Sequence, residues 1–210
     1  MRQLGCVPYL ETWELQRSLA SQRAADTIPD TLLLLEHPPT YTIGRSGGHA
    51  HLLVPPETLA ARGATLVEVD RGGDITYHGP GQLVGYPILQ IKNHGRDLHQ
   101  YLRMLEQVLI DGLATYGLEG RRFPGYTGVW VGAEKIAAIG IRVNARGVTS
   151  HGFALNVNTN LADFAAIVPC GISAYGVTSL ERLLGQPQPL AEVGARVISA
   201  FEHSFNLRQP

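Results

Sequence analysis

The sequence predicts an α+β protein with a mixed, mostly antiparallel sheet that is flanked by helices. Strand-like and helix-like segments both occur, but they do not alternate regularly as they do in a doubly wound fold. Three strand-like runs follow one another over residues 128–159 and are joined by turns at GAE and NARG, which is typical of antiparallel hairpins. Glycine and proline occur along the whole chain as turn residues, which indicates one domain over residues 1–210.

The N-terminal half contributes two helices and three strands. The apolar spacing of ETWELQRSLASQRA predicts a helix over residues 11–24. The apolar run TLLLLEH (31–37) predicts a buried strand that ends at two prolines, and TYTIGR (40–45) predicts a second strand. PPETLAARG (55–63) opens with proline and closes with glycine, as helices do, and ATLVEVDR (64–71) alternates apolar and polar residues like a strand.

The C-terminal half adds further helices around the three consecutive strands. The clearest helical periodicity covers residues 96–117, and Asp97 is the expected N-cap. In VTSLERLLG, the spacing of Thr178 and Glu181 matches a capping box at a helix start. A last helix is expected over residues 190–205.

The composition argues against two classes of partner. The 17 Lys and Arg residues nearly equal the 18 Asp and Glu residues, so the basic excess of a nucleic-acid binder is missing, although Arg121 and Arg122 leave a local basic patch open. The start of the chain does not resemble a signal peptide, and the longest apolar run is too short to span a bilayer. The two cysteines lie far apart, so no disulfide framework is expected. We expect a soluble cytoplasmic protein that binds neither nucleic acid nor membranes.

The densest stretch of unusual residues is RGGDITYHGPGQLVGYPILQ, residues 71–90. Its glycines let the backbone bend sharply and approach a ligand closely. Arg71 and His78 could meet a carboxylate, a carbonyl or a phosphate. From these residue types alone, a ligand-binding loop and a tight turn between strands are both open.

Nucleotide and metal motifs fit poorly. GPGQLVG resembles a dinucleotide fingerprint, but its glycine spacing is one residue too long and the strand-like run YPILQI follows where a helix is required. No phosphate-binding P-loop motif occurs. His49 and His51 suggest a metal, yet no zinc-type spacing accompanies them, so we expect no metal and no cofactor.

Cys170 lies between Pro169 and Gly171 in the stretch IVPCG. A free cysteine is commonly a buried, inert side chain. This one is expected in a loop ahead of a capped helix, where reactive thiols also occur, and it would need a base. Lys135, His78 and His151 are the candidates.

Lys135 opens the apolar strand KIAAIGIRV directly after a turn. One interpretation is a lysine at a strand edge that discourages aggregation. The other is a partly desolvated lysine that can exchange protons near neutral pH.

The segments RGGDITYHGPGQLVGYPI, GVWVGAEKIAAIG, HGFALNVNTNL and IVPCGI, in this order and spacing, closely resemble the lipoyl(octanoyl) transferases. PPTYTIGRS and VTSLERLLG resemble the flanking segments of that family, so the resemblance covers residues 33–185. Asn160 stands where such sequences more often carry Asp, beside the site loop and off the matched catalytic positions.

The resemblance implies the fold of the biotin/lipoate protein ligase catalytic domain, an acyltransferase activity and specific partners. The enzyme would take an octanoyl (or lipoyl) group from octanoyl-acyl carrier protein. It would pass the group to one lysine of a lipoyl domain, as found in 2-oxoacid dehydrogenase E2 subunits and in glycine cleavage H protein. We expect a monomer.

The resemblance also assigns site residues. Cys170 falls on the acyl-accepting cysteine of the family and Lys135 on the lysine that partners it. The matched substrate-binding positions are Arg71, Gly72, Gly73, Asp74, Ile75, Thr76, Tyr77, His78, Ala138, Ile139, Gly140, Gly152, Phe153 and Ala154.

Two other functions remain open on the sequence. An ATP-dependent lipoate or biotin ligase of the same fold would activate a free acid as an adenylate, a chemistry that gives no use for Cys170. A non-catalytic protein that only binds acyl groups or carrier proteins would have no need of Cys170 and Lys135 together.

Overall fold

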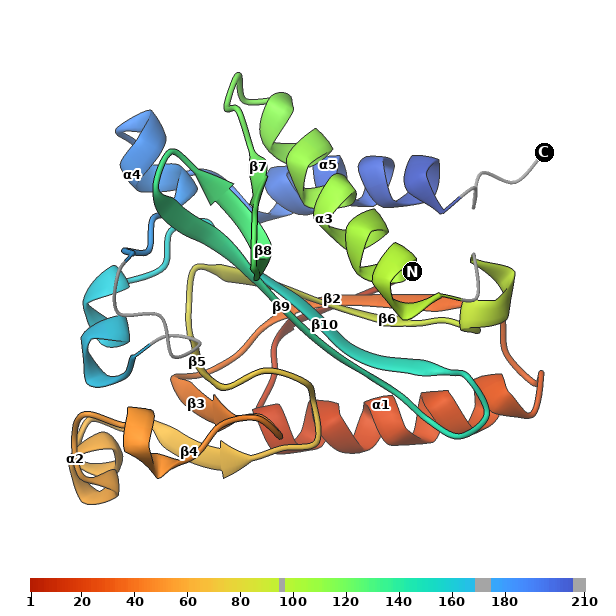
Figure 1. Cartoon of the computed structure of the whole chain (residues 1–210), viewed down its shortest axis with the longest axis horizontal. Coiled ribbons are helices and arrows are strands. Elements are labelled where there is room, and N and C mark those ends of the chain that lie inside the picture. Colours follow the sequence, from red (N-terminus) through yellow and green to blue (C-terminus); the bar gives the residue numbers. More distant parts are fainter. Residues whose placement is uncertain (95–96, 169–174, 206–210) are drawn as a thin grey trace.

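The computed structural model describes residues 1–94, 97–168 and 175–205 and contains two sheets (Figure 1). The large sheet has the order β1–β2–β6–β10–β9–β8–β7, and the small sheet has the order β4–β3–β5. The large-sheet strands are, in that order, Arg2–Cys6, Thr31–Glu36, Gln82–Ile88, Thr149–Asn156, Glu134–Val143, Tyr126–Val131 and Arg121–Phe123. The small-sheet strands are Thr65–Glu68, Thr40–Ile43 and Ile75–His78.

Within the described ranges, β1 pairs with β2 in parallel and β3 pairs with β4 in parallel, whereas the other named pairs are antiparallel. The predicted α+β class with a mixed, mostly antiparallel sheet is therefore confirmed. The rejection of a dinucleotide loop is confirmed as well, because strand β6 begins at Gln82, inside GPGQLVG, where a nucleotide-binding helix would have to start.

Helices cover both faces of the large sheet (Figure 1). The helices are α1 (Tyr9–Ala24), α2 (Pro56–Ala61), α3 (Leu98–Ala114), α4 (Leu180–Leu184) and α5 (Leu190–Ser204), with 3-10 turns η1 (His49–His51), η2 (Ile91–Asn93) and η3 (Leu161–Ala166). Helix α1 lies against one face, and α3 and α5 lie together against the other. None of these helices is long and apolar enough to cross a membrane.

Three apolar clusters hold these layers together. The largest joins α3 and α5 to the sheet, and Tyr101, Leu105 and Val108 of α3 are fully buried in it. A second cluster packs Leu19 of α1 on the opposite face, and a third fills the small sheet. Burial of this apolar surface is the main favourable term for folding, at roughly 25 cal/mol per Å².

Some local predictions are corrected by the structure. Asp97 is the N-cap of α3 as expected, and its side chain accepts a hydrogen bond of 3.0 Å from the backbone N–H of His99. Helix α4, however, is capped by Ser179 rather than Thr178, because it is the Ser179 hydroxyl that accepts from the N–H of Arg182. Arg122 does not contribute to a free basic patch, because its guanidinium contacts the buried carboxylate of Glu106 at 3.0 Å.

Strand β9 extends beyond its neighbour β8 and leaves part of its edge open. The pairing between β8 and β9 covers Glu134 to Ala137 on β9. Further along, the backbone N–H of Gly72 donates to the carbonyl of Ile141 at 2.9 Å. The glycine-rich segment that precedes β5 therefore closes the edge of the large sheet, and this contact positions the candidate site.

Candidate active site

Two neighbouring cavities border this junction and share Gly72, Gly73, Asp74, Ile139 and Gly140 as walls. We call the smaller one, with a volume of about 50 Å³, the inner cavity. The larger one, of about 600 Å³, is the outer cleft, and it contains Lys135. The predicted binding residues that border the inner cavity are Arg71, Gly72, Gly73, Asp74, Thr76, His78, Ala138, Ile139, Gly140, Gly152, Phe153 and Ala154.

Two predicted residues lie elsewhere. Ile75 and Tyr77 alternate with Thr76 and His78 along β5, so their side chains face the other side of the strand. There they join the apolar cluster of the small sheet, and the Tyr77 hydroxyl donates to Asp163 at 3.0 Å. Within β5, the structure thus turns Thr76 and His78 toward the inner cavity and places Ile75 and Tyr77 in a core.

Close backbone approach explains the glycines of the site. A Cβ on Gly140 would lie 2.9 Å from the carbonyl oxygen of Gly72, and a Cβ on Gly152 would lie 2.1 Å from that of Gly85. Both contacts are shorter than carbon–oxygen packing allows, so the strands reach their present spacing only without side chains here.

Arg71 is buried at the junction of the two sheets. Its Nη2 donates to the carbonyl oxygen and the hydroxyl of Thr42, at 2.7 and 2.8 Å, and its Nη1 donates to the carbonyl of Gly72 at 3.0 Å. These bonds tie the glycine-rich segment to β3. Its positive charge also acts on the histidines that lie deeper in the site.

Aromatic and histidine side chains close the deep end of the inner cavity. Tyr9, Tyr86 and His151 line the cavity there beside His78, and Tyr9 lies near His37. The hydroxyl of Tyr86 bonds to Nε2 of His37 at 2.7 Å, and Nδ1 of His37 donates to the carbonyl of Val7 at 2.7 Å. Tyr9 and Tyr86, which line the cavity, are not among the residues that the sequence predicts for the site. Tyr86 lies within the glycine-rich motif, whereas no local pattern marks Tyr9.

Burial keeps these histidines neutral. It lowers the pKa of His37 to about 4, and burial together with His37 and Arg71 lowers the pKa of His78 well below its usual range. Burial and the neighbouring arginines, Arg71 first, lower the pKa of His151 to about 3. A neutral imidazole has one donor and one acceptor nitrogen, and the hydrogen bonds at His37 use both.

His151 has a backbone conformation that is unusual for a residue with a side chain. Its φ is 55°, in the left-handed region. Its ring lies toward α1, where Nδ1 is 3.4 Å from the Tyr9 hydroxyl, and Nε2 is 2.8 Å from Asp70. Such a conformation costs about 1–3 kcal/mol and clusters at functional sites. Here it accompanies a histidine that forms part of the cavity wall.

Lys135 lies in the outer cleft and is buried except for 7% of its surface. Its Nζ is 5.1 Å from the centre of the Trp130 ring. The backbone beside it is fixed from both directions, because its N–H donates to Gly176 at 2.9 Å and its carbonyl accepts from Thr178 at 3.0 Å. His78 and His151, the other candidate bases, border the inner cavity instead.

Cys170 lies outside the described residues. Of the described residues around it, Val168 is bonded to a residue of the outer cleft, and Tyr175 packs on the ring that Lys135 contacts. The N–H of Val168 donates to the carbonyl of His51, which lines the cleft, at 2.8 Å. On the other side, the Tyr175 ring packs against Trp130 with 5.6 Å between ring centres.

His49 and His51 each pair with a separate carboxylate. His49 contacts Glu68 at 3.1 Å, and His51 contacts Asp74, which also accepts a hydrogen bond from the N–H of Ile75. Across the described ranges, no three His, Cys, Asp or Glu side chains gather in a way that would hold a metal ion.

Similarity to solved structures concerns the fold. A bipartite lipoate protein ligase from Thermoplasma acidophilum superposes with a TM-score of 0.69 over 98% of this chain and 83% of that one, at 17% identity. A biotin protein ligase from Aquifex aeolicus superposes with a TM-score of 0.60 over 98% of this chain and 69% of that one, at 14% identity. The fold that the sequence resemblance implied is confirmed.

Sequence relatives are much closer. The model of the lipoyl protein ligase A/B catalytic domain matches residues 8–202. An octanoyltransferase from Rubrobacter xylanophilus is 58% identical, with 94% of this chain and 89% of that protein covered. The chain therefore belongs to the octanoyltransferases of the lipoyl protein ligase A/B catalytic domain family.

Proposed function

We propose that this chain is a single-domain octanoyltransferase that moves an octanoyl group from acyl carrier protein to a lysine of a lipoyl domain, with Cys170 as the acyl carrier in between. The observation that carries the proposal is the joining of the two cavities. The inner cavity is lined mainly by apolar surface, and it opens beside the cleft that holds Lys135. Part of an acyl chain can occupy the first, whose volume is smaller than that of an octanoyl group, while the remainder and the carbonyl lie in the second.

The inner cavity suits an acyl chain for a specific reason. Ala138 and Ala154 face each other across the β9–β10 pair, and their small side chains leave room above the sheet. The polar groups at the deep end bond largely to each other, as the Tyr86–His37 and His151–Asp70 contacts illustrate. Polar groups that are already bonded do not need the ligand to supply a partner.

The first half-reaction would transfer the acyl group to Cys170. The thiolate attacks the thioester carbonyl of the donor and forms a tetrahedral oxyanion. Collapse breaks the donor carbon–sulfur bond, and the released pantetheine thiolate takes up a proton. One thioester replaces another, so the step is nearly isoenergetic and needs no ATP.

The second half-reaction would form the amide. The neutral amine of the acceptor lysine attacks the Cys170 thioester, the carbon–sulfur bond breaks, and the nitrogen loses a proton. Lys135, which lines the outer cleft, would accept that proton as a general base or would hold the thiolate by its charge. Amide formation from a thioester is downhill and drives the sequence.

Chain connectivity supports the pairing of Cys170 with Lys135. In the sequence, Cys170 stands between Val168 and Tyr175, the nearest described residues on either side of it. Val168 is hydrogen-bonded to His51 at the rim of the outer cleft, and the chain returns at Tyr175 beside Trp130, which Lys135 also contacts. Neither His78 nor His151 has an equivalent contact to these anchors among the described residues.

A transfer assay tests the proposal. Octanoyl-acyl carrier protein and a lipoyl domain are mixed with the chain in the absence of ATP, and octanoylation of the acceptor lysine is followed by mass. A parallel reaction contains free octanoate and ATP. We expect transfer in the first reaction and none in the second. Octanoylation only from octanoate and ATP would instead identify an ATP-dependent ligase.

A further inference from the structure

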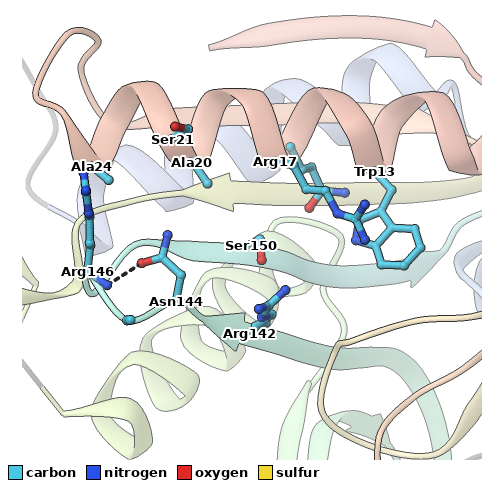
Figure 2. A pocket seen from close by; sticks show the side chains of 11 residues that line it. Trp13, Arg17, Ala20, Ser21, Ala24, Arg142, Asn144, Arg146 and Ser150 are labelled. Carbon is cyan, nitrogen blue, oxygen red and sulfur yellow. Dashed lines mark hydrogen bonds between the residues drawn. The ribbon is translucent and has the colours of Figure 1, made fainter.

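A separate groove lies beside the site, between helix α1 and the β9–β10 hairpin (Figure 2). It has a volume of about 350 Å³. Arg17, Arg142 and Arg146 line it, and no acidic residue does. In a chain with 17 basic and 18 acidic residues, this local excess of one sign stands out. We call it the arginine groove.

Each arginine of the groove makes a different contact. The Arg17 guanidinium stacks over the Trp13 ring, 4.0 Å from its centre. Arg146 lies in the hairpin turn, where the Asn144 side chain accepts a hydrogen bond of 2.9 Å from the backbone N–H of Arg146 (Figure 2). Arg142 pairs with Asp70 behind the groove. Arg17 and Arg146 are exposed, so their charges face solvent.

The groove adjoins the inner cavity on the same face of the sheet. Ser150 and Arg142 pair across β10 and β9 and line the groove, and the next pair on that face, Gly152 and Gly140, lines the inner cavity. Asp70 connects the two, since it contacts Arg142 on the groove side and His151 on the cavity side. A molecule in the arginine groove therefore sits next to the cavity that we assign to the acyl chain.

We propose that the arginine groove docks a carboxylate-rich face of the acyl-donor protein, an inference that rests on the proposed function. Clustered like charges repel unless an opposite charge lies among them, and a groove of one sign attracts and orients an oppositely charged partner. The donor is favoured over the acceptor because the donor brings the acyl chain. The outer cleft, with the exposed apolar side chains Leu98 and Tyr126 at its wall, is left for the acceptor.

The test compares two donors that carry the same acyl group. One is octanoyl-acyl carrier protein, and the other is octanoyl-pantetheine, which lacks both protein and phosphate. The variant is the double charge reversal Arg17→Glu/Arg146→Glu. Arg142 is left unchanged because it is paired with Asp70. The matched control is Arg2→Glu/Arg62→Glu, which changes the net charge equally at exposed positions outside the groove.

We expect the groove variant to raise the KM for octanoyl-acyl carrier protein about tenfold or more, with little change in kcat, because charge complementarity acts mainly on encounter. Its KM for octanoyl-pantetheine and for the lipoyl domain should stay within about twofold of the wild-type value, as should all constants of the control. Added salt should raise the wild-type KM for the carrier protein and hardly change that of the variant. Arg17→Lys/Arg146→Lys should retain most of the wild-type behaviour.

Several outcomes would overturn the docking proposal. If the groove variant and the control raise the KM for octanoyl-acyl carrier protein equally, the effect comes from the net charge of the protein and not from the groove. A raised KM for the lipoyl domain instead would assign the groove to the acceptor. An equal loss with octanoyl-phosphopantetheine as donor would assign it to the phosphate of the arm. If the wild-type chain transfers octanoyl from neither donor, the proposed function itself fails, which is a separate result.

Discussion

At the scale of single residues, the site combines buried, neutral histidines with the buried basic side chains of Arg71 and Lys135. His37, His78 and His151 surround the deep end of the inner cavity, and their pKa values are lowered chiefly by burial. Lys135 lies apart from them in the outer cleft. In the proposed function, this separation would give the two cavities different tasks: the inner cavity would hold part of the acyl chain, and the outer cleft would hold the reacting groups.

The buried histidines predict a characteristic loss of stability in weak acid. Their pKa values are below the ordinary value of 6.5 in the folded state, so the unfolded chain binds more protons as the pH falls. The stabilisation is complete above about pH 6.5 and declines toward the folded pKa values, about 4 for His37 and about 3 for His151. From pH 6.5 to 5, each histidine should remove up to about 2 kcal/mol of unfolding free energy.

Urea unfolding at a series of pH values measures this slope. His37→Gln should reduce the change of unfolding free energy with pH by an amount that corresponds to about one proton taken up on unfolding. His203→Gln, at an exposed position of α5, should leave this pH dependence unchanged. An unfolding free energy that stays flat between about pH 7.5 and 5 would contradict the neutral state of these side chains.

Two substitutions of Lys135 separate its charge from its ability to exchange a proton. Lys135→Met removes both, so alkylation of Cys170 by iodoacetamide near neutral pH should slow, and octanoyl transfer should fall further. Lys135→Arg keeps a charge but does not release a proton, so it should retain much of the alkylation rate and little of the transfer. An alkylation rate that is equal in wild type and Lys135→Met at every pH would exclude the pairing.

At the scale of secondary structure elements, the site depends on how the segment of residues 70–74 closes the edge of β9. The three strands 126–131, 134–143 and 149–156 could be predicted from their alternation and hairpin turns, and they occur as expected. The sequence does not predict the short strands β1, β5 and β7, because three to five residues carry too little periodicity. That is also why the opposite orientations of Tyr77 and His78 were missed.

The close contact at this edge predicts a specific effect of Gly140→Ala. The new Cβ would lie 2.9 Å from the Gly72 carbonyl oxygen and 3.2 Å from Cδ of Arg71, so the glycine-rich segment must shift. We expect octanoyl transfer to fall at least about tenfold while the protein remains folded, because small displacements of positioning groups strongly slow catalysis. Transfer kinetics and circular dichroism measure the two effects.

Gly194→Ala is the matched control. Gly194 lies inside α5, and its added Cβ would be 4.0 Å from a methyl group of Leu34, an ordinary contact. It should raise stability by about 0.5–1 kcal/mol and leave transfer unchanged. Equal activity of the Gly140→Ala and Gly194→Ala proteins would show that the contact between β9 and the glycine-rich segment does not matter for function.

The position of α3 over the outer cleft predicts a structural role for Glu106. This carboxylate is fully buried on α3 and accepts from Arg103 at 2.7 Å, Arg122 at 3.0 Å and the N–H of Gly128 at 3.2 Å. Removing this carboxylate leaves its partners without their acceptor in a buried place. Glu106→Ala should therefore lower the free energy of unfolding, measured in urea, by about 3–5 kcal/mol. Arg103→Ala, at a half-exposed guanidinium, should cost about 1 kcal/mol or less.

At the scale of the whole molecule, two sheets and segments far apart in sequence assemble the inner cavity. Tyr9 comes from α1, His78 from the small sheet, and Tyr86 and His151 from the large sheet. The glycine-rich motif and the Lys135 strand carry enough local signal to be found in the sequence. Tyr9 carries no such signal, because its place in the cavity wall depends on the packing of α1 against β6 and β10, which no local pattern encodes.

The most direct test of the covalent route is the intact mass of the chain after brief mixing with octanoyl-acyl carrier protein, without ATP or acceptor. We expect one octanoyl adduct that hydroxylamine removes, that peptide mapping assigns to Cys170 and that disappears when a lipoyl domain is added. Cys170→Ala should carry no adduct and should not support transfer. An unmodified mass without acceptor, in a preparation that transfers octanoyl once the lipoyl domain is added, or full transfer by Cys170→Ala, would contradict a mechanism through this cysteine.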